Sequence, residues 1–185
     1  FTQEPILPSV SGTWFATDAM QVRASYGRTT SRPNLNELSE ARFFDPDSGE
    51  GFVGDVDLKP ATIDGVDLRW EWYPTPTESV TFGGFWKGYT DPIERTFTQV
   101  GGSDPLGTFQ NADAARVLGI EVGGRFEFAH LREWVGGPEW IEHLYVLGNL
   151  AILNSQVTLS SAGVDTNAER PLDGQAVYAF NAQAG

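Results

Sequence analysis

The sequence predicts an all-β fold in which about seven long strands form an antiparallel meander. Apolar and polar residues alternate with a period of two, which is the period of a strand and not of a helix. The 185 residues include 21 glycines, 12 phenylalanines and 6 tryptophans, a composition typical of strands and turns. Short and long connections also alternate, as they do when the two ends of a meander differ.

Net charge and composition exclude several classes of protein. Twelve Lys and Arg against 25 Asp and Glu give a net charge of −13, so we expect no nucleic-acid partner, because duplex binding requires a basic surface. The absence of cysteine excludes a disulfide scaffold. The chain has no run of about 20 apolar residues, which a membrane-spanning helix requires. A hydrophobic share of 40% is sufficient for a folded domain, and the length indicates a single one.

Each predicted strand has one apolar face. In the first two strands this face carries Val10 and Trp14, then Met20, Val22, Ala24 and Tyr26. In the third it carries Val66, Leu68, Trp70 and Trp72, and in the fourth Val80, Phe82 and Trp86. A fifth strand continues the pattern with Leu118, Ile120, Val122 and Phe126, and a late one shows Tyr178 and Phe180. Alternation of this kind places all of these side chains on one side of a sheet.

The opposite face is polar and carries charges of both signs within single strands. The candidates for this face are Asp67, Arg69, Glu71, Glu121, Arg125 and Glu127. The connections 17–19 and 74–77 are short, those at about 33–60, 101–111 and 160–174 are long, and 131–143 is of middling length. Short links therefore fall at one end of the meander and long ones at the other.

Two environments produce such alternation. A soluble β-sandwich buries its apolar faces in a core, whereas a membrane barrel turns them to lipid and keeps a polar lumen. Mixed charges on the polar face, aromatic residues near strand ends and unequal loops favour the barrel. Two alternatives remain: a soluble β-sandwich that binds carbohydrate through aromatic residues, and a small complete outer-membrane barrel.

No motif points to an enzyme, a cofactor or a metal. The two histidines, His130 and His143, flank an acidic connection, but their spacing fits no usual zinc pattern. Residues 49–54 satisfy G-x-G-x-x-G, yet an acidic loop precedes them where a nucleotide site needs a strand. The paired carboxylates Glu121 and Glu127 have an arginine close by, which indicates charge balance and not acid–base catalysis.

The connection 33–60 is acidic and also contains several aromatic residues. Most charged loops are simply solvated. Long loops on a rigid scaffold also carry recognition, so this segment is a candidate gate or ligand-contacting surface. The candidates for ligand contact are Arg42, Phe43, Phe44, Asp45, Asp47 and Phe52.

Six short motifs, in the expected order, resemble the β-barrel of TonB-dependent outer-membrane receptors. Residues 23–33 (RASYGRTTSRP) resemble a strand that ends in Arg-Pro before a long outer loop, and 54–60 (GDVDLKP) the family's Gly-Asn-Pro-x-Leu-Lys-Pro. Residues 85–87 (FWK), together with 91–93 (DPI), resemble a later strand of the family, and residues 119–121 (GIE) resemble the start of another. Two further landmarks follow in the expected order: residues 148–150 (GNL), and residues 170–175 (RPLDGQ) together with Asn181. The family's Asn-Pro is Asp55-Val56 here.

The resemblance implies that residues 1–185 are part of a barrel of about 22 strands, with the plug domain and the terminal strands elsewhere. Family members import iron–siderophores, cobalamin, haem or oligosaccharides across the bacterial outer membrane. The expected partners are outer-membrane lipid, the plug domain of the same full-length chain, the TonB complex through the N-terminal part and a small nutrient ligand. The apolar residues 66, 68, 70, 72, 118, 120, 122 and 126 would then face lipid, and the six charged candidates would face the lumen or the plug.

Overall fold

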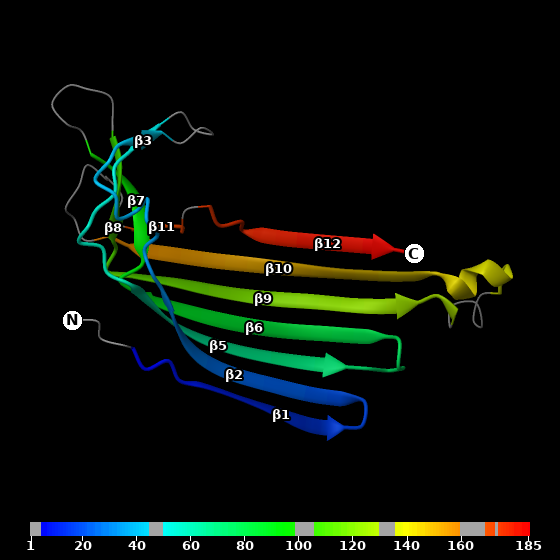
Figure 1. Cartoon of the computed structure of the whole chain (residues 1–185). Coiled ribbons are helices and arrows are strands. Elements are labelled where there is room, and N and C mark those ends of the chain that lie inside the picture. Colours follow the sequence, from blue (N-terminus) through cyan, green and yellow to red (C-terminus); the bar gives the residue numbers. More distant parts are fainter. Residues whose placement is uncertain (1–4, 45–49, 99–105, 130–135, 160–168, 173) are drawn as a thin grey trace.

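The computed structural model describes residues 5–44, 50–98, 106–129, 136–159, 169–172 and 174–185. Its main feature is one antiparallel sheet with the strand order β1-β2-β5-β6-β9-β10 (Figure 1). The strands are β1 (Ser9–Thr17), β2 (Met20–Ser31), β5 (Ala61–Trp72), β6 (Ser79–Thr90), β9 (Ala114–Glu127), β10 (Tyr145–Thr158), β11 (Glu169–Arg170) and β12 (Tyr178–Ala184). The all-β antiparallel meander is therefore confirmed.

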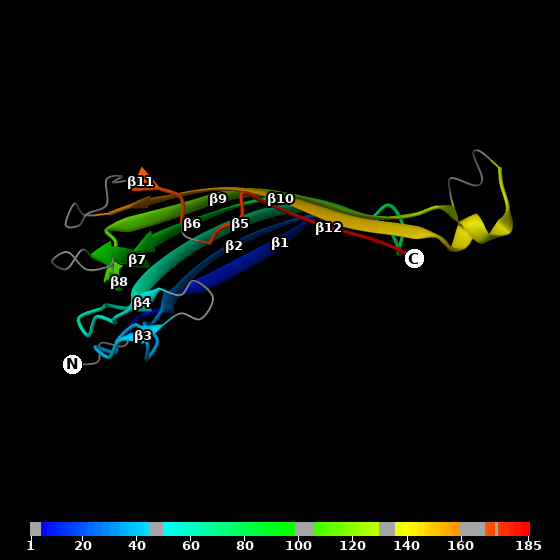
Figure 2. The same cartoon turned by 90° about the horizontal axis from the view of Figure 1, so that it is seen from above.

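The last two strands share one edge of β10. Arg170 of β11 pairs with Val157, and β12 pairs with β10 from Val146 to Ile152. Eight strands thus occupy seven positions across the described part of the sheet, as the sequence predicted. Figure 2 shows that this sheet is bowed.

An uninterrupted register carries each face across the sheet. Arg69 lies opposite Arg23 on β2 and Gly83 on β6, and Gly83 in turn lies opposite Glu121 on β9. Residues paired in this way point to the same side of a sheet. The polar face and the apolar face are consequently continuous over neighbouring strands.

Connections at one end of the sheet are mostly short. Residues 18–19 join β1 to β2, and residues 73–78 join β5 to β6. The third connection, 128–144, is longer and contains the 3-10 helix η1 (Glu139–His143), which the sequence did not predict. A helix of five residues is too short to show an apolar period.

A second sheet stands at the opposite end, where the long connections gather (Figures 1 and 2). It has the order β3-β4-β8-β7, with β3 (Phe43–Phe44), β4 (Gly51–Phe52), β7 (Ile93–Thr98) and β8 (Leu106–Asn111). Part of the predicted long connection 101–111 is therefore a strand, since β8 lies within it, and β3 and β4 likewise lie within 33–60. Strand β6 ends before Asp91, which has a φ of 53°, and Pro92. The chain then continues into β7, which pairs with β8 as an antiparallel hairpin.

A small core lies at the end of the main sheet where the long connections begin. Ala112, Ala115, Val157 and Leu159 are buried together, with Tyr89 and Leu172 packed against them. Ala115, Val157 and Tyr89 lie on the same side of the sheet as Glu121. The apolar face on the other side stays open: Leu68 and Leu118 are 56% and 58% exposed.

Both alternatives to a sector of a larger barrel conflict with this structure. A sandwich would bury the apolar face of the main sheet under a second sheet, but the described second sheet stands at the end of the first. A small barrel closed by the described strands alone would pair β1 with β12, but these two strands lie at opposite edges of the described sheet. Among the described residues, no helix has both the length and the apolar character needed to cross a membrane.

We predict that Val157→Ala lowers the free energy of unfolding of the intact protein by about 1–3 kcal/mol, because the Val157 side chain is fully buried in this small core. The matched control is Val56→Ala, at a position that is 56% exposed, with an expected effect of about 0.5 kcal/mol or less. Urea unfolding followed by tryptophan fluorescence measures both. Equal losses in the two variants would contradict the assignment of the core.

Candidate functional site

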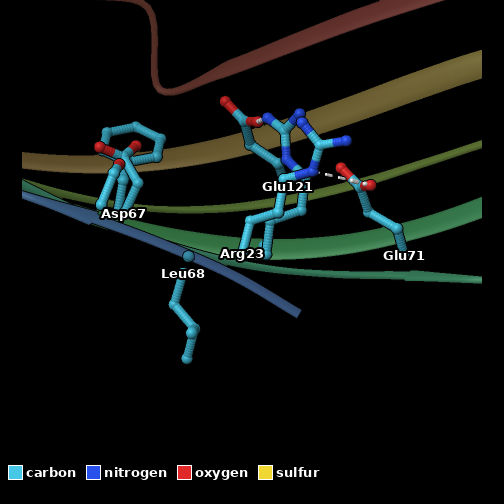
Figure 3. A pocket seen from close by; sticks show the side chains of 10 residues that line it. Arg23, Asp67, Leu68, Glu71 and Glu121 are labelled. Carbon is cyan, nitrogen blue, oxygen red and sulfur yellow. Dashed lines mark hydrogen bonds and ion pairs between the residues drawn. The ribbon is translucent and has the colours of Figure 1, made fainter. Parts of the chain in front are cut away.

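The polar face brings together charged residues from three strands. Arg23 on β2 lies 3.3 Å from Glu71 on β5, and Arg69 on β5 lies 3.3 Å from Glu121 on β9. Figure 3 shows Arg23, Asp67, Glu71 and Glu121 on one side of the sheet and Leu68 on the other. The predicted separation of the third strand into a polar and an apolar face is thus present in the structure.

Glu71 is the most enclosed carboxylate of this group, with 5% of the residue exposed. The Gln21 amide donates to Glu71 Oε2, and the Tyr73 hydroxyl donates to the same atom at 2.9 Å. The hydrogen bond to this carboxylate raises the pKa of Tyr73, which lies just beyond the end of β5. Because Arg23 and these two donors satisfy Glu71, the carboxylate serves as an acceptor that holds neighbouring side chains in place.

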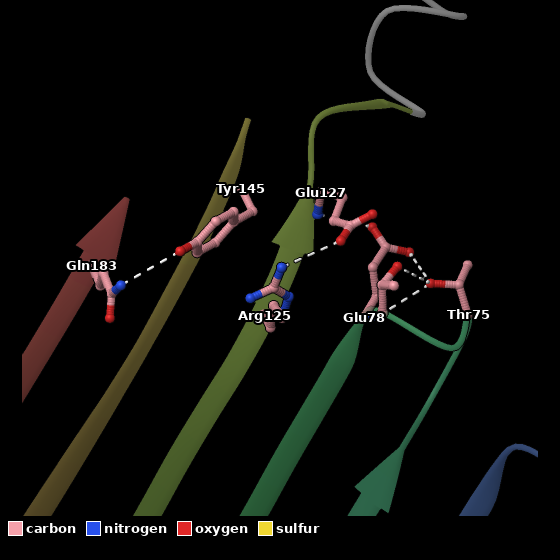
Figure 4. Close-up of polar contacts among 7 residues, drawn as sticks. Thr75, Glu78, Arg125, Glu127, Tyr145 and Gln183 are labelled. Atoms are coloured by element: carbon pink, nitrogen blue, oxygen red, sulfur yellow. Dashed lines mark hydrogen bonds and ion pairs between the residues drawn. The ribbon is translucent and has the colours of Figure 1, made fainter. Parts of the chain in front are cut away.

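Arg125 and Glu127 belong to a separate cluster at the end with the short connections (Figure 4). Their side chains are 3.4 Å apart, and the Glu127 backbone N–H donates to Glu78 Oε1 at 3.2 Å. The Arg125 guanidinium lies 4.0 Å from the centre of the Tyr145 ring, a cation–π distance. The six charged candidates therefore divide into two groups and do not form one site.

The predicted apolar residues lie on the opposite face, and most have large exposed fractions. Val66, Leu68, Trp72, Leu118, Ile120, Val122 and Phe126 are between 36% and 58% exposed, and Trp70 is partly exposed. They extend over β5 and β9, and the register places Phe82 of β6 between Trp70 and Val122. An apolar area of this extent is more than scattered surface residues and marks an interaction surface.

At the other end, the long connections form one compact unit around an aromatic cluster. Phe52 stacks against Phe43 with ring centres 5.9 Å apart and also contacts Phe97 and Phe109 at 6.2 and 6.0 Å. The Arg95 guanidinium lies 4.2 Å from the centre of the Phe52 ring. Residues from the connections between β2 and β5 and between β6 and β9 therefore share one small core.

This packing corrects one predicted ligand contact. Phe52 is fully buried, so its side chain is not available to a ligand in this structure. Phe44 is 75% exposed and Arg42 is also exposed, while Phe43 is half-buried within the aromatic cluster. Asp45 and Asp47 lie outside the described residues.

Three side chains that the sequence did not single out as site residues tie the long connections together. Arg170 Nη2 donates to Glu94 Oε2 at 3.2 Å and to the backbone oxygen of Arg95 at 2.9 Å. Asn111 Nδ2 donates to the backbone oxygens of Lys59 and Asp91 at 2.9 and 2.8 Å, and its Oδ1 accepts from the Lys59 N–H. Partners 52 and 76 residues apart give no local pattern that sequence reasoning could use.

The turn that closes the connection between β2 and β5 contains the Asp55-Val56 departure from the family motif. The Asp55 carboxylate accepts from the Asp57 N–H at 2.9 Å, which is an Asx-type interaction. Gly54 before it approaches the 36–39 backbone so closely that a Cβ there would lie 2.4 Å from the Glu37 oxygen. A glycine is required at this position by the close approach of two backbone segments.

Within the described ranges, no group of three or more His, Cys, Asp or Glu side chains could hold a metal ion. His143 lies at the end of η1, and His130 lies outside the described residues.

Comparisons with known proteins give a consistent result. The family model described as "TonB dependent receptor-like, beta-barrel" matches residues 2–184. No curated protein sequence matches the chain.

Several solved structures have the same fold. The siderophore receptor PirA from Pseudomonas aeruginosa aligns with a TM-score of 0.61 and 18% identity, over 84% of this chain and 31% of that one. PirA from Acinetobacter baumannii aligns with a TM-score of 0.60 and 15% identity, over 95% of this chain and 26% of that receptor. A third structure is a double mutant of the Serratia marcescens hemophore receptor HasR in complex with its hemophore HasA and heme. It aligns with a TM-score of 0.64 and 10% identity, over 95% of this chain and 27% of that receptor. The chain spans less than a third of each receptor, and at these identities the likeness shows the fold.

We predict that Arg170→Gln loosens the unit formed by the long connections. Glu94 is 5% exposed, and loss of the guanidinium beside it costs about 1–3 kcal/mol. Amide hydrogen exchange in β7 and β8 should therefore become about tenfold faster or more. Arg42→Gln, at an exposed position with no ion-pair partner among the described residues, should leave these rates unchanged. Equal protection in wild type and Arg170→Gln would show that the pair does not hold the unit together.

Proposed function

Because the chain belongs to the TonB-dependent receptor-like β-barrel family, we propose that it forms one sector of the wall of a bacterial outer-membrane receptor that imports a scarce nutrient. The observation that carries this proposal is the seven-position antiparallel meander with one apolar and one polar face. The family's barrels have about 22 strands and a plug domain inside. No catalytic role is assigned, in keeping with a family of receptors.

The apolar face is proposed to contact lipid. On β9 its residues run from Leu118 to Phe126, eight residues apart, which corresponds to about 26 Å along the strand. These nine residues fall within the roughly 9–11 that a tilted strand needs to cross the membrane. Exposed Leu, Ile and Val side chains are costly in water and favourable against acyl chains.

The polar face is proposed to face the lumen and the plug domain of the same full-length chain. Arg69 and Glu121 are paired with each other yet remain half-exposed, so each guanidinium and carboxylate has capacity for further hydrogen bonds. A plug with polar side chains of both signs would complement this surface. Energy for import would reach the plug from the TonB complex, as the family resemblance implies.

The proposed ligand is an iron–siderophore or haem, with cobalamin or an oligosaccharide as alternatives. The structural neighbours named as siderophore and hemophore receptors support the first two, although they share only the fold with this chain. The exposed Arg42 and Phe44, at the end where the long connections gather, are the proposed contacts on this sector.

Transport itself can be tested in cells. We predict that the full-length protein, produced in a strain that lacks its own iron receptors, is found in the outer-membrane fraction and supports uptake of radiolabelled iron from one class of siderophore or from haem. Uptake should disappear when TonB is deleted. A protein found only in the soluble fraction would contradict both the location and the transport proposal.

The lipid-facing assignment can be tested separately. We predict that Ile120→Arg lowers the stability of the inserted barrel by about 2–4 kcal/mol, because it places a cation at mid-depth in the membrane. The control is Asn149→Arg, on the polar face beside Asn181, with an expected cost of about 1 kcal/mol or less. Unfolding in urea with lipid vesicles present measures both. Equal costs for the two variants would contradict the assignment of the faces.

A further inference from the structure

A row of four polar residues and one glycine crosses the apolar face on five consecutive strands. Arg28 on β2 pairs with Asp64 on β5, and the row continues through Gly88 on β6, Arg116 on β9 and Gln156 on β10. We call these five residues the headgroup row. They point to the apolar side of the sheet because each lies two residues from an apolar-face position, as Arg116 does from Leu118.

The headgroup row marks the upper border of the apolar face, on the side of the long connections. The next positions below it are Tyr26, Val66, Trp86 and Leu118, with Asn154 on β10. The next positions above it are Thr30, Thr62, Thr90 and Thr158, with Ala114 on β9. Along each strand, the three levels run from mostly apolar, through mostly charged, to mostly hydroxyl-bearing side chains. The first and third levels are four residues apart, which is about 13 Å. This sequence of polarities matches the passage from acyl chains to headgroups at a membrane surface.

The two arginines of the row differ in their partners. The Arg28 guanidinium makes two hydrogen bonds to the Asp64 carboxylate, at 2.8 and 3.0 Å, and the Tyr26 hydroxyl donates to the same carboxylate at 2.6 Å. Arg116 instead donates to the Gln156 amide oxygen, and no carboxylate in the described part of the chain pairs with it. A guanidinium has five N–H donors, so Arg116 keeps an uncompensated charge and most of its donors.

The surface below Arg116, on the side away from the long connections, is apolar. Gly88 has no side chain, and a Cβ there would lie 2.5 Å from the Trp86 ring, so the indole occupies the space next to Arg116 in the row. Leu118, Ile120 and Ile152 continue the apolar face below it and are each about half-exposed. An acyl chain lying on these residues would bring its headgroup to the level of Arg116.

We propose that Arg116 binds the phosphate group of an anionic lipid of the outer membrane, whose acyl chains lie on the apolar face below. The proposal rests on the assignment of that face to lipid under the proposed function. Guanidinium groups bind phosphate by charge-assisted hydrogen bonds that match its geometry. The chain as a whole carries a net charge of −13, so binding of an anionic lipid requires a local cation, and Arg116 is the one without a carboxylate partner in the headgroup row.

The test uses the full-length receptor in detergent micelles that contain increasing amounts of phosphatidic acid, with phosphatidylcholine as the reference lipid. Lipid retained per receptor, measured by native mass spectrometry, gives the apparent affinity. We predict that Arg116→Gln weakens binding of phosphatidic acid about fivefold, the effect of one basic residue near an anionic surface. Arg116→Lys should lose less of the affinity for phosphatidic acid, because lysine keeps the positive charge. The matched control is Lys59→Gln, an exposed cation in the connection before β5, which should bind as wild type does.

Three results would overturn the proposal: equal affinity of wild type and Arg116→Gln, an equal loss in Lys59→Gln, or full displacement of the lipid by the same concentration of inorganic phosphate. The last would identify a free-anion site and not a lipid site. Recovery of each variant from the outer-membrane fraction distinguishes this inference from the proposed function. A receptor that is inserted but indifferent to Arg116→Gln contradicts the lipid site alone, whereas a receptor absent from that fraction contradicts the proposed function.

Discussion

The continuous backbone hydrogen-bond register of the main sheet is the constraint on which the other features depend. A strand presents alternate residues to opposite sides, so a shift of one residue on β5 would exchange Leu68 with Asp67 and reverse both faces. The register is maintained over eleven or more paired positions in each of the four central pairs, β2–β5, β5–β6, β6–β9 and β9–β10. Separation of lipid-compatible and polar side chains follows from this ladder without any buried core along most of the sheet.

Where the long connections leave the sheet, a different kind of stabilisation takes over. Val157 and Leu159 are buried with small alanines, and Phe52 packs among three other phenylalanine rings. Arg170 and Asn111 then satisfy backbone oxygens of segments that are far apart in sequence. The described residues at this end of the sheet therefore form a packed unit and not a set of separate loops.

Charges on the two faces have different surroundings. On the polar face Arg23 and Arg69 each have a carboxylate partner, which leaves a mixed surface suited to another protein domain. On the apolar face of the described strands, charge is confined to the headgroup row, where Arg28 is neutralised by Asp64 and Arg116 has no described carboxylate partner. The same sheet can thus meet water, protein and lipid at different positions, since side-chain direction alone decides which solvent each residue contacts.

The sequence by itself determined the fold class, the two faces and the division into short and long connections, because all three depend on local alternation and on turn residues. Leu118, Ile120 and Glu121 could be assigned to their faces from spacing alone. The tertiary structure decided the contacts between residues that are far apart in the sequence. It buried Phe52, folded 93–98 and 106–111 into a hairpin, and placed Arg170 against Glu94 across 76 residues. It also aligned Arg116 with Arg28, since only the pairing of strands sets which residues become neighbours across a sheet.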